Sequence, residues 1–381
     1  MRVAGRDAIS GEDIEIHFDR ALTHVDPLLG TPERSGTFIA PGFIDLQVNG
    51  FAGVDFGGAN TNVDDIGAAL EKILSTGVTR CFPTLITASP EALISRLRVL
   101  ARARASLAHG QALEAFHVEG PHISSEDGPR GAHPKEWVRP PDIEEYRRWQ
   151  DAADGQVRMI TAAPEWPGIT KYIEQVTLDG VVVSIGHTGA TAAQIHDAVL
   201  AGATMSTHLG NGAGSKDRRD AFIEQQLMET RLNASFIVDG HHLPQEFLRR
   251  AIEAKGLERS VLVTDAVAPA MCQPGPYTLG GVDVELRDDG RVTLRGAERL
   301  AGSALRMDRA ITNATTQAGV TLGQAIVMAT RNAARAGRVP GRLRGFQPGE
   351  RADLVLFQTI KGRIEVLETY VSGQRVFLRA S

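Results

Sequence analysis

Eight short apolar segments of strand type recur through the middle of this 381-residue chain, and segments of helix type separate most of them. The strand-type segments are residues 43–49, 79–85, 113–120, 157–164, 181–187, 203–209, 233–240 and 261–266. The helix-type segments include 64–75, 90–108, 192–200, 222–230, 244–254, 307–318 and 321–335. Alternation of strand and helix predicts an α/β fold with a parallel sheet and right-handed crossovers. Eight such units favour closure into a (β/α)8 barrel of the TIM type, and an open doubly wound sheet is the alternative.

Polar side chains stand at the C-terminal end of almost every predicted strand, which favours the barrel over the open sheet. They are Gln47, Asn49, Thr84, Glu119, Glu165, His187, His208, Asp239 and Asp265. In a barrel, the C-terminal ends of all the strands converge on one pocket. We therefore expect the functional site at this end of the barrel.

Both ends of the chain carry further β-type segments. They are 13–18 and 36–40 near the N-terminus, and 352–357, 364–367 and 368–377 near the C-terminus. Neither end can bury a sheet alone. We predict a small β-sandwich domain from residues 1–41 and 348–381, beside a barrel of residues 42–347.

Residues 275–302 break the alternation of strand and helix. Two β-type stretches, 278–286 and 291–294, flank Arg287-Asp288-Asp289-Gly290, and Asp-Gly is a strong turn signal. This pattern predicts an inserted β-hairpin near 275–302. Because the insertion follows the eighth strand, it should lie on the face of the expected site, where it is a candidate lid.

Composition excludes several classes of protein. A net charge of -5 and a pI near 6.1 argue against a general nucleic-acid binder. Two cysteines, Cys81 and Cys272, are too few for a disulfide framework and predict free thiols in a reducing compartment. No run approaches the ~18 apolar residues of a membrane span, and residues 1–15 lack a signal-type segment. We expect a cytoplasmic protein that binds neither nucleic acid nor membrane.

Glu119, His187 and His208 are candidate metal ligands. A lone histidine at such a position is more often a core or capping residue, but three ligand-type residues at three strand ends favour a metal site. One carboxylate and two imidazoles with an open position are typical of catalytic zinc and iron sites, and cobalt or manganese would also fit. A metal lowers the pKa of its water from 15.7 towards about 7, which provides hydroxide at neutral pH.

Asp265 and His133 are the candidate catalytic side chains. Asp265 ends the eighth strand and could take up and return a proton, with a capping role or a fourth metal ligand as alternatives. His133 lies in a Gly/Pro-rich loop that could reach over the pocket to polarise a carbonyl, and a solvated loop residue is the alternative. His122 follows Pro121 and is expected to turn away from the site.

Two later segments are candidates for substrate binding. Asn211 and Gly212 follow His208 in a turn whose backbone N–H groups could cradle an anion. Lys216, Arg218 and Arg219 come next and could supply charge for a phosphate, although a solvated basic loop is the alternative. His241 and His242 follow the seventh strand, and one of them is a candidate for contact with the substrate.

Seven segments in this order resemble the N-acetylglucosamine-6-phosphate deacetylases of the amidohydrolase superfamily over nearly the whole chain. They are residues 41–50, 117–121, 186–191, 207–211, 239–243, 262–266 and 300–305. The resemblance implies a (β/α)8 barrel with a terminal β-sandwich and a homodimer. It also implies that Glu119, His187 and His208 bind the metal, that Asp265 is the catalytic acid and base, and that His133 contacts the substrate carbonyl. The substrate-binding positions that we expect from it are Gln47, His133, Asn211, Gly212, His242, Ala301, Gly302 and Ser303, with Arg218 or Arg219 on the phosphate, in some members across the subunit interface.

Two segments depart from the superfamily pattern. Gln47 and Asn49 occupy positions where many amidohydrolases carry His-x-His, which predicts one divalent metal per subunit, zinc in the first place and Fe2+, Co2+ or Mn2+ as alternatives. Residues 210–213 replace a pattern close to aromatic-Asn-Ala-Met in the region that holds the sugar phosphate. The departure at 210–213 makes the deacetylation chemistry a firmer prediction than the substrate.

The predicted reaction is the deacetylation of a small N-acetyl amino sugar phosphate, namely N-acetylglucosamine-6-phosphate to glucosamine-6-phosphate and acetate. N-acetylgalactosamine-6-phosphate, an N-acyl amino acid or a cyclic amide are alternative substrates. A non-catalytic ligand-binding relative is the alternative from a different class. It is disfavoured because a binding module has no need of all three ligands together with Asp265.

Overall fold

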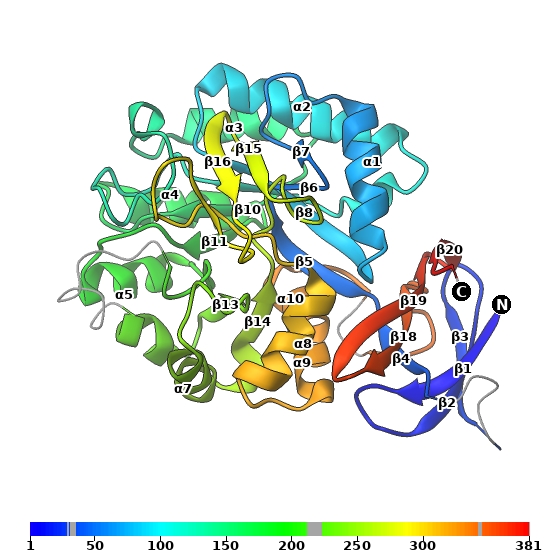
Figure 1. Ribbon diagram of the computed structural model, residues 1–381. Helices are drawn as coiled ribbons and strands as arrows, with labels where there is room; N and C mark the ends of the chain where they lie inside the picture. Colours follow the sequence, from blue (N-terminus) through cyan, green and yellow to red (C-terminus); the bar gives the residue numbers. More distant parts are fainter. Residues whose placement is uncertain (29, 31–35, 212–222, 342–344, 381) are drawn as a thin grey trace.

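An eight-stranded parallel sheet forms the centre of the protein (Figure 1). The computed structural model describes residues 1–28, 30, 36–211, 223–341 and 345–380. The strands are β5 (Phe43–Val48), β8 (Val78–Ile86), β9 (Phe116–Glu119), β10 (Val157–Ala162), β11 (Val182–Ile185), β12 (Met205–Ser206), β13 (Asn233–Ile237) and β14 (Ser260–Val263). They pair in the order β14-β13-β12-β11-β10-β9-β8-β5, which confirms all eight predicted strands.

The first and last strands of this sheet meet and close it into a barrel. The backbone N–H of Asp265 donates to the carbonyl of Gln47 at 3.0 Å, and that of Asn49 donates to the carbonyl of Ala266 at 2.7 Å. Val48 and Ala266 form a parallel bridge. The predicted barrel is confirmed, and the open sheet is wrong.

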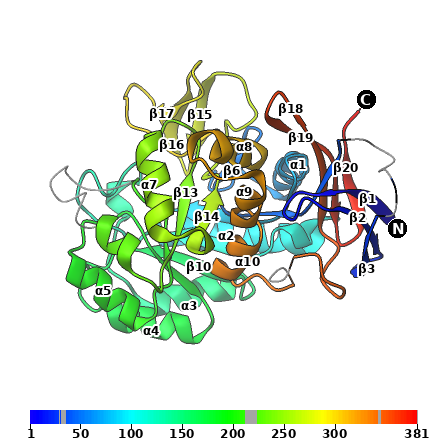
Figure 2. The same cartoon turned by 90° about the horizontal axis from the view of Figure 1, so that it is seen from below.

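Helices surround the barrel on its outer side (Figures 1 and 2). They are α1 (Val63–Leu74), α2 (Pro90–Ser106), α3 (Ile143–Ala152), α4 (Ile169–Leu178), α5 (Ala192–Ala201), α7 (Gln245–Lys255), α8 (Met307–Gln317), α9 (Leu322–Met328) and α10 (Arg331–Ala336). Residues 223–228 are also helical, within the predicted segment 222–230. Local sequence sets several starts, since Asn62, Thr191 and Thr321 form capping boxes. None of the helices in the described ranges combines the length and the apolar character that a membrane crossing requires.

The predicted helix 321–335 is two helices, α9 and α10. Thr330 interrupts them, because its backbone leaves the helical region at φ -132 and ψ -89. Its hydroxyl donates to the carbonyl of Ile326 at 2.6 Å, a local hydrogen bond that competes with the helical pattern. The apolar periodicity continues through this break, which is why the sequence alone predicts one helix.

Both termini contribute to a second sheet, of seven strands, beside the barrel (Figure 1). Its strands are β1 (Arg2–Asp7), β2 (Asp13–Phe18), β3 (Leu22–Pro27), β4 (Phe38–Pro41), β18 (Leu354–Ile360), β19 (Arg363–Val371) and β20 (Gln374–Leu378). They pair in the order β20-β19-β18-β4-β1-β2-β3, so the two ends of the chain form one hydrogen-bonded sheet. Ile16, Leu22, Ile39 and Leu354 belong to its own apolar core. The predicted small β domain is confirmed, and its boundaries at 41 and 348 stay a prediction.

The C-terminal strands differ from the prediction in their division. Residues 364–367 and the first part of 368–377 form one continuous strand, β19. The chain turns at Ser372 and Gly373, both of which have positive φ, and returns as β20. The sequence does carry a signal for this turn, because Ser372-Gly373-Gln374-Arg375 separates the apolar residues Val371 and Val376, and Ser-Gly marks turns.

The insertion after β14 is a three-stranded antiparallel sheet of β15 (Gly275–Leu279), β16 (Val282–Leu286) and β17 (Val292–Leu294). The predicted turn at 287–290 is confirmed, but the predicted strand 278–286 is broken at Gly280 and Gly281. Their φ values of +57 and +90 make a tight turn that adds the third strand. The N–H of Gly280 donates to Oδ2 of Asp55 at 2.7 Å, which anchors the insertion to the barrel loop after β5.

Asp45 is a buried carboxyl that joins β5 to the end of β14. It is 2% exposed, and its Oδ2 accepts a hydrogen bond from the hydroxyl of Thr264 at 2.6 Å. Its Oδ1 accepts from the backbone N–H groups of Thr264 and Gln47 at 3.2 and 3.3 Å. Burial raises the pKa of Asp45 from 3.8 to about 7, although these hydrogen bonds oppose the rise. This carboxyl therefore fixes the backbone next to Gln47 and Asp265.

We predict that Asp45→Asn keeps the fold and changes the pH dependence of stability. A carboxyl with a pKa of about 7 in the folded protein and 3.8 in the unfolded chain stabilises the fold at low pH. That contribution is lost as the pH rises through this window. Asn is neutral at every pH. As the pH rises through this window, the free energy of unfolding of wild type should therefore fall relative to that of Asp45→Asn, by on the order of a few kcal/mol. Urea unfolding of both proteins across these pH values measures the difference, and parallel pH profiles would contradict the account.

Candidate functional site

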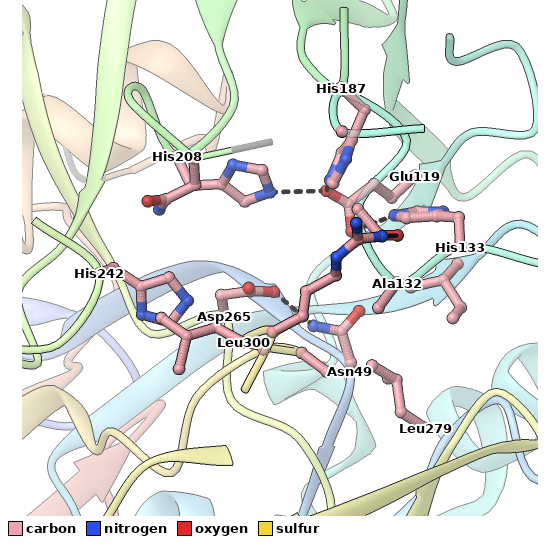
Figure 3. Close-up of a pocket in the computed structure, with 17 residues that line it drawn as sticks. Asn49, Glu119, Ala132, His133, His187, His208, His242, Asp265, Leu279 and Leu300 are labelled. Carbon is pink, nitrogen blue, oxygen red and sulfur yellow. Dashed lines mark hydrogen bonds and ion pairs between the residues drawn. The ribbon is translucent and has the colours of Figure 1, made fainter. Parts of the chain in front are cut away.

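A pocket of about 250 Å³ lies at the C-terminal ends of the barrel strands (Figure 3). Its titratable lining comes from different strands: Glu119 ends β9, His133 lies in the loop after β9, and His187, His208, His242 and Asp265 follow β11, β12, β13 and β14. The barrel therefore brings together residues that lie far apart in the sequence. This is the convergence that the polar strand ends predict.

Glu119 lies at the centre of a group of imidazoles (Figure 3). Its side chain is 3% exposed, and its Oε1 lies 2.9 Å from Nε2 of His208 and 3.2 Å from Nε2 of His187. Its Oε2 lies 3.9 Å from Nε2 of His133. Burial opposes ionisation, but the hydrogen bonds and charges of His187 and His208 outweigh burial and hold the pKa of Glu119 well below its usual range. Glu119 is therefore a carboxylate, and it attracts cations.

The hydrogen bond of His187 prepares its imidazole to bind a cation. Nδ1 lies 2.9 Å from the carbonyl oxygen of Pro129, which can only accept, so Nδ1 carries the proton. The other ring nitrogen, Nε2, faces Oε1 of Glu119 and carries a lone pair whenever it is not protonated. Two lone pairs at 3.2 Å repel each other unless a cation or a proton compensates them. This donor set fits a divalent metal.

His133 has the opposite arrangement of protons. Its Nδ1 lies 2.8 Å from the hydroxyl of Thr87 and accepts from the backbone N–H of Thr87 at 3.4 Å. Nδ1 is therefore the acceptor, and the proton is on Nε2, which faces the pocket. Burial, aided by the charge of His187, lowers the pKa of His133 from 6.5 to about 3, so the ring is neutral. His133 is set to donate a hydrogen bond into the pocket.

Distance alone would also admit His133 as a metal ligand. Donor atoms of Glu119, His133 and His187 all lie within 4.8 Å of one another. The hydrogen bond from Thr87 distinguishes His133 from His187 as a possible ligand, because it leaves His133 without a lone pair on the nitrogen that faces the pocket. His208 approaches Glu119 from another side, and its buried Nδ1 has no hydrogen-bond partner among the described residues.

Backbone strain marks three residues of the site. His187, His208 and Asp265 have φ values of 49, 27 and 49, in the left-handed region that side chains with a Cβ rarely adopt. Each lies two residues after the end of its strand, where the chain turns sharply into a loop. Such strain persists only where the surrounding structure enforces it, and it is concentrated at functional sites.

Asp265 is a second buried carboxyl in the same pocket. Its Oδ1 accepts hydrogen bonds from Nδ2 of Asn49 at 2.7 Å and from Nε2 of Gln47 at 3.1 Å. Burial, together with the charge of Glu119, raises the pKa of Asp265 from 3.8 to about 6. A carboxyl with such a pKa can both take up and release a proton near neutral pH.

The other predicted substrate residues divide into three groups. Asn211, His242, Ala301 and Gly302 line the pocket. Gln47 holds Asp265 instead, and the hydroxyl of Ser303 donates to the carbonyl of Thr264 at 2.6 Å, so neither contributes a lining side chain. Gly212, Arg218 and Arg219 lie outside the described residues, as does Lys216.

His122 turns away from the pocket, as the sequence predicts. Its Nδ1 lies 3.2 Å from the carbonyl oxygen of Arg139, and its ring stacks on Trp149 at a centroid distance of 5.4 Å. Of the other histidine pair, His242 lines the pocket and His241 does not. Oδ2 of Asp239 lies 2.7 Å from Nδ1 of His242 and holds that ring in place.

Several residues of the site were not assigned a role from the sequence. Thr87 and Asp239 orient His133 and His242, and both lie at or just beyond the C-terminal end of a strand-type segment, 79–85 and 233–240, which is the one signal that points to them. Ile86 and Leu279 form an apolar part of the lining. Arg299 also lines the pocket, and its Nη1 donates to the carbonyl of Gly131 at 3.3 Å.

A barrel whose C-terminal strand ends gather a carboxylate, several imidazoles and a separate protonatable carboxyl defines a metal-dependent amide hydrolase. The model of the amidohydrolase family matches residues 38–376. The N-acetylglucosamine-6-phosphate deacetylase of Bos taurus is 35% identical over 354 residues, which cover 90% of this chain and 84% of that protein. The N-acetylgalactosamine-6-phosphate deacetylase of Escherichia coli O157:H7 is 31% identical over 363 residues, which cover 93% and 92%.

The fold is also similar to a solved structure along almost its whole length. It is a variant of the N-acetyl-D-glucosamine-6-phosphate deacetylase of Mycobacterium smegmatis in complex with N-acetyl-D-glucosamine-6-phosphate. That chain superposes with a TM-score of 0.88 at 31% identity, with 99% of each chain covered. The chain therefore belongs to the amidohydrolase family, within its group of N-acetylglucosamine-6-phosphate deacetylases.

We predict that His133 is neutral, with its proton on Nε2, down to at least pH 5. The Thr87 hydroxyl occupies Nδ1, and the pKa of the ring is about 3. Long-range proton–nitrogen NMR of histidine-labelled protein reports the tautomer, and Thr87→Val should release it. A His133 signal that titrates near its usual pKa of about 6.5, or that shows protonated Nδ1, would contradict the assignment.

Proposed function

We propose that this protein removes the acetyl group from an N-acetyl amino sugar 6-phosphate, with N-acetylglucosamine-6-phosphate as the first candidate. The products are glucosamine-6-phosphate and acetate. The observation that carries the proposal is that the pocket holds two buried carboxyls whose pKa values are shifted in opposite directions. Glu119 is held as a carboxylate among imidazoles, whereas the pKa of Asp265 is raised to about 6. One group suits a cation and the other suits proton transfer.

We assign Glu119, His187 and His208 as the ligands of one divalent metal. The lone pair of His187 and the carboxylate of Glu119 support the assignment. Zinc suits this donor set, and Fe2+, Co2+ or Mn2+ are also compatible with it. Asn49 and Gln47 donate to Asp265 and are not imidazoles, which favours a single metal. A divalent cation there supplies Lewis-acid polarisation and a nucleophile at neutral pH.

The protein's own groups then act on the amide. His133 donates its Nε2 proton in a hydrogen bond to the acyl oxygen as negative charge develops there. Removal of one such donor typically costs about 10²–10³-fold in kcat. Asp265 accepts a proton from the attacking water and returns it to the leaving nitrogen. Because both amide donors act on Oδ1 of Asp265, we assign the proton transfer to Oδ2.

We assign the sugar and its phosphate to the side of the pocket that carries Asn211 and His242. The buried Nδ2 of Asn211 has no partner among the described residues and is available to a ligand. Asp239 accepts from Nδ1 of His242, which leaves Nε2 of that ring for a substrate oxygen. Gly212, Arg218 and Arg219 follow Asn211 in the sequence and stay candidates for the phosphate, and Ala301 and Gly302 of the lining are assigned to the same substrate. A homodimer in the cytoplasm completes the proposal. The cytoplasmic location is supported by the two free cysteines, Cys81 and Cys272, which fit a reducing compartment.

The test measures acetate release from three substrates with the metal-loaded protein. They are N-acetylglucosamine-6-phosphate, N-acetylgalactosamine-6-phosphate and unphosphorylated N-acetylglucosamine. We expect the first to have the highest kcat/KM, and the unphosphorylated sugar to fall at least about 10²-fold below it, because buried polar groups of the site then lack a partner. Preference for the galactosamine compound would replace the first candidate by the second. Equal or absent activity on the phosphorylated and unphosphorylated sugars would contradict the assignment of a sugar phosphate.

A further inference from the structure

Three apolar side chains in the lining of the pocket, Ile86, Ala132 and Leu279, lie apart from the polar side chains of Asn211 and His242. Asn211 and His242 follow β12 and β13, whereas Ile86 ends β8 and Ala132 lies in the loop after β9. In the closed sheet, β8 and β9 lie across the barrel from β12 and β13. Figure 3 shows Ala132 and Leu279 on the side of His133, with His242 on the opposite side. A bound molecule is therefore oriented by polarity.

The apolar side flanks the hydrogen-bond donor of the pocket. Ala132 directly precedes His133, and Ile86 directly precedes Thr87, whose hydroxyl lies 2.8 Å from Nδ1 of His133. Asp265 follows β14, next to β13, on the polar side. If the acyl oxygen contacts Nε2 of His133 and the amide nitrogen contacts Asp265, the acyl chain points to Ile86, Ala132 and Leu279.

We propose that Ile86, Ala132 and Leu279 form the acyl subsite of this pocket, and that Leu279 limits the acyl group to acetyl. This assignment rests on the proposed amide hydrolysis and deepens it. It gives the inserted sheet a direct role in specificity, since Leu279 is the last residue of β15. The substrates selected are N-acyl amino sugar phosphates with a two-carbon acyl group.

Leu279 and Ile86 are packed firmly enough for the acyl subsite to discriminate between acyl groups by their size. Leu279 is 5% exposed and packs in one apolar cluster with Ile86, Val284 and Leu286. The next residue, Gly280, donates its N–H to Asp55 at 2.7 Å. A Cβ at Gly280 would lie 2.7 Å from Cγ1 of Ile86, so the turn lies directly against that side chain. A longer acyl chain would therefore have to displace packed atoms, which close-packed interiors resist.

Space for a longer acyl chain exists beside the proposed acyl subsite, on the side of Ala132. A second cavity of about 600 Å³ shares Ala132 and His133 with the first and is also lined by Thr87, Gly280 and Leu294. Shortening Leu279 removes the atoms beside Gly280 at the edge of this space. The arrangement predicts a gain of activity on longer acyl groups, which general damage to the fold would not produce.

The experiment compares wild type, Leu279→Ala and Leu286→Ala on N-acetyl-, N-propionyl- and N-butyryl-glucosamine-6-phosphate. Leu286 is the matched control, because it belongs to the same cluster and is 6% exposed but does not line the pocket. Wild type should lose about 10–200-fold in kcat/KM for each added methylene. Leu279→Ala should raise the butyryl-to-acetyl ratio of kcat/KM at least about 10-fold, whereas Leu286→Ala should leave it unchanged.

Each outcome decides between the assignments. An unchanged ratio in Leu279→Ala, with acetyl still hydrolysed, overturns the acyl subsite and leaves the proposed function in place. Equal wild-type activity on acetyl and butyryl substrates does the same. Absence of hydrolysis of any of these amides by wild type overturns the proposed function itself. Ile86→Val, which removes one methylene, replaces Leu279→Ala if that variant does not fold. It should shift the preference towards propionyl by a smaller factor, and an unchanged ratio would again overturn the subsite.

Discussion

The buried carboxylate of Glu119 is the interaction on which the site depends. A charge that is 3% exposed is strongly destabilising unless partners compensate it. In this protein the compensation comes from imidazoles on three different loops, and each loop is held by the closed barrel. Losing one partner of a buried ion pair typically costs ~3–5 kcal/mol, so the geometry of the barrel and the charge of the site stabilise each other. A divalent cation among the same atoms would strengthen this arrangement.

The environment gives the two buried carboxyls of the pocket different protonation behaviour. The hydrogen bonds and charges of the imidazoles hold the pKa of Glu119 well below its usual range, whereas burial and the charge of Glu119 raise the pKa of Asp265 to about 6, against the hydrogen bond from Asn49. His187 and His133 differ in which ring nitrogen a hydrogen bond keeps protonated. A backbone carbonyl fixes the proton of His187 on Nδ1, and a threonine hydroxyl fixes that of His133 on Nε2. Hydrogen bonds from outside the pocket thus determine which group binds a cation and which donates or accepts a proton.

The sequence predicts the barrel and the location of the site because both depend on local patterns. Strand-type runs alternate with helix-type runs, and polar residues stand where the strands end. The partners that orient the site do not follow from such patterns. Thr87 and His133 are 46 residues apart, and Gln47 and Asp265 are 218 apart. Only the closed barrel shows that Gln47 holds Asp265 and that Ser303 bonds the backbone. The sequence predicts one strand over 278–286, because β-type residues continue on both sides of Gly280 and Gly281. In the structure these two glycines form a turn, and the residues before it form the additional strand β15.

In the proposed function, Glu119 serves a metal and Asp265 serves proton transfer. The most direct measurement compares Glu119→Gln and Asp265→Asn with wild type, for bound metal by elemental analysis and for acetate release from N-acetylglucosamine-6-phosphate. We expect Asp265→Asn to retain one metal per chain and to lose about 10²–10⁴-fold in kcat, whereas Glu119→Gln should lose the metal and the activity together. Near-normal turnover by Asp265→Asn, or full metal content in Glu119→Gln, would contradict these roles.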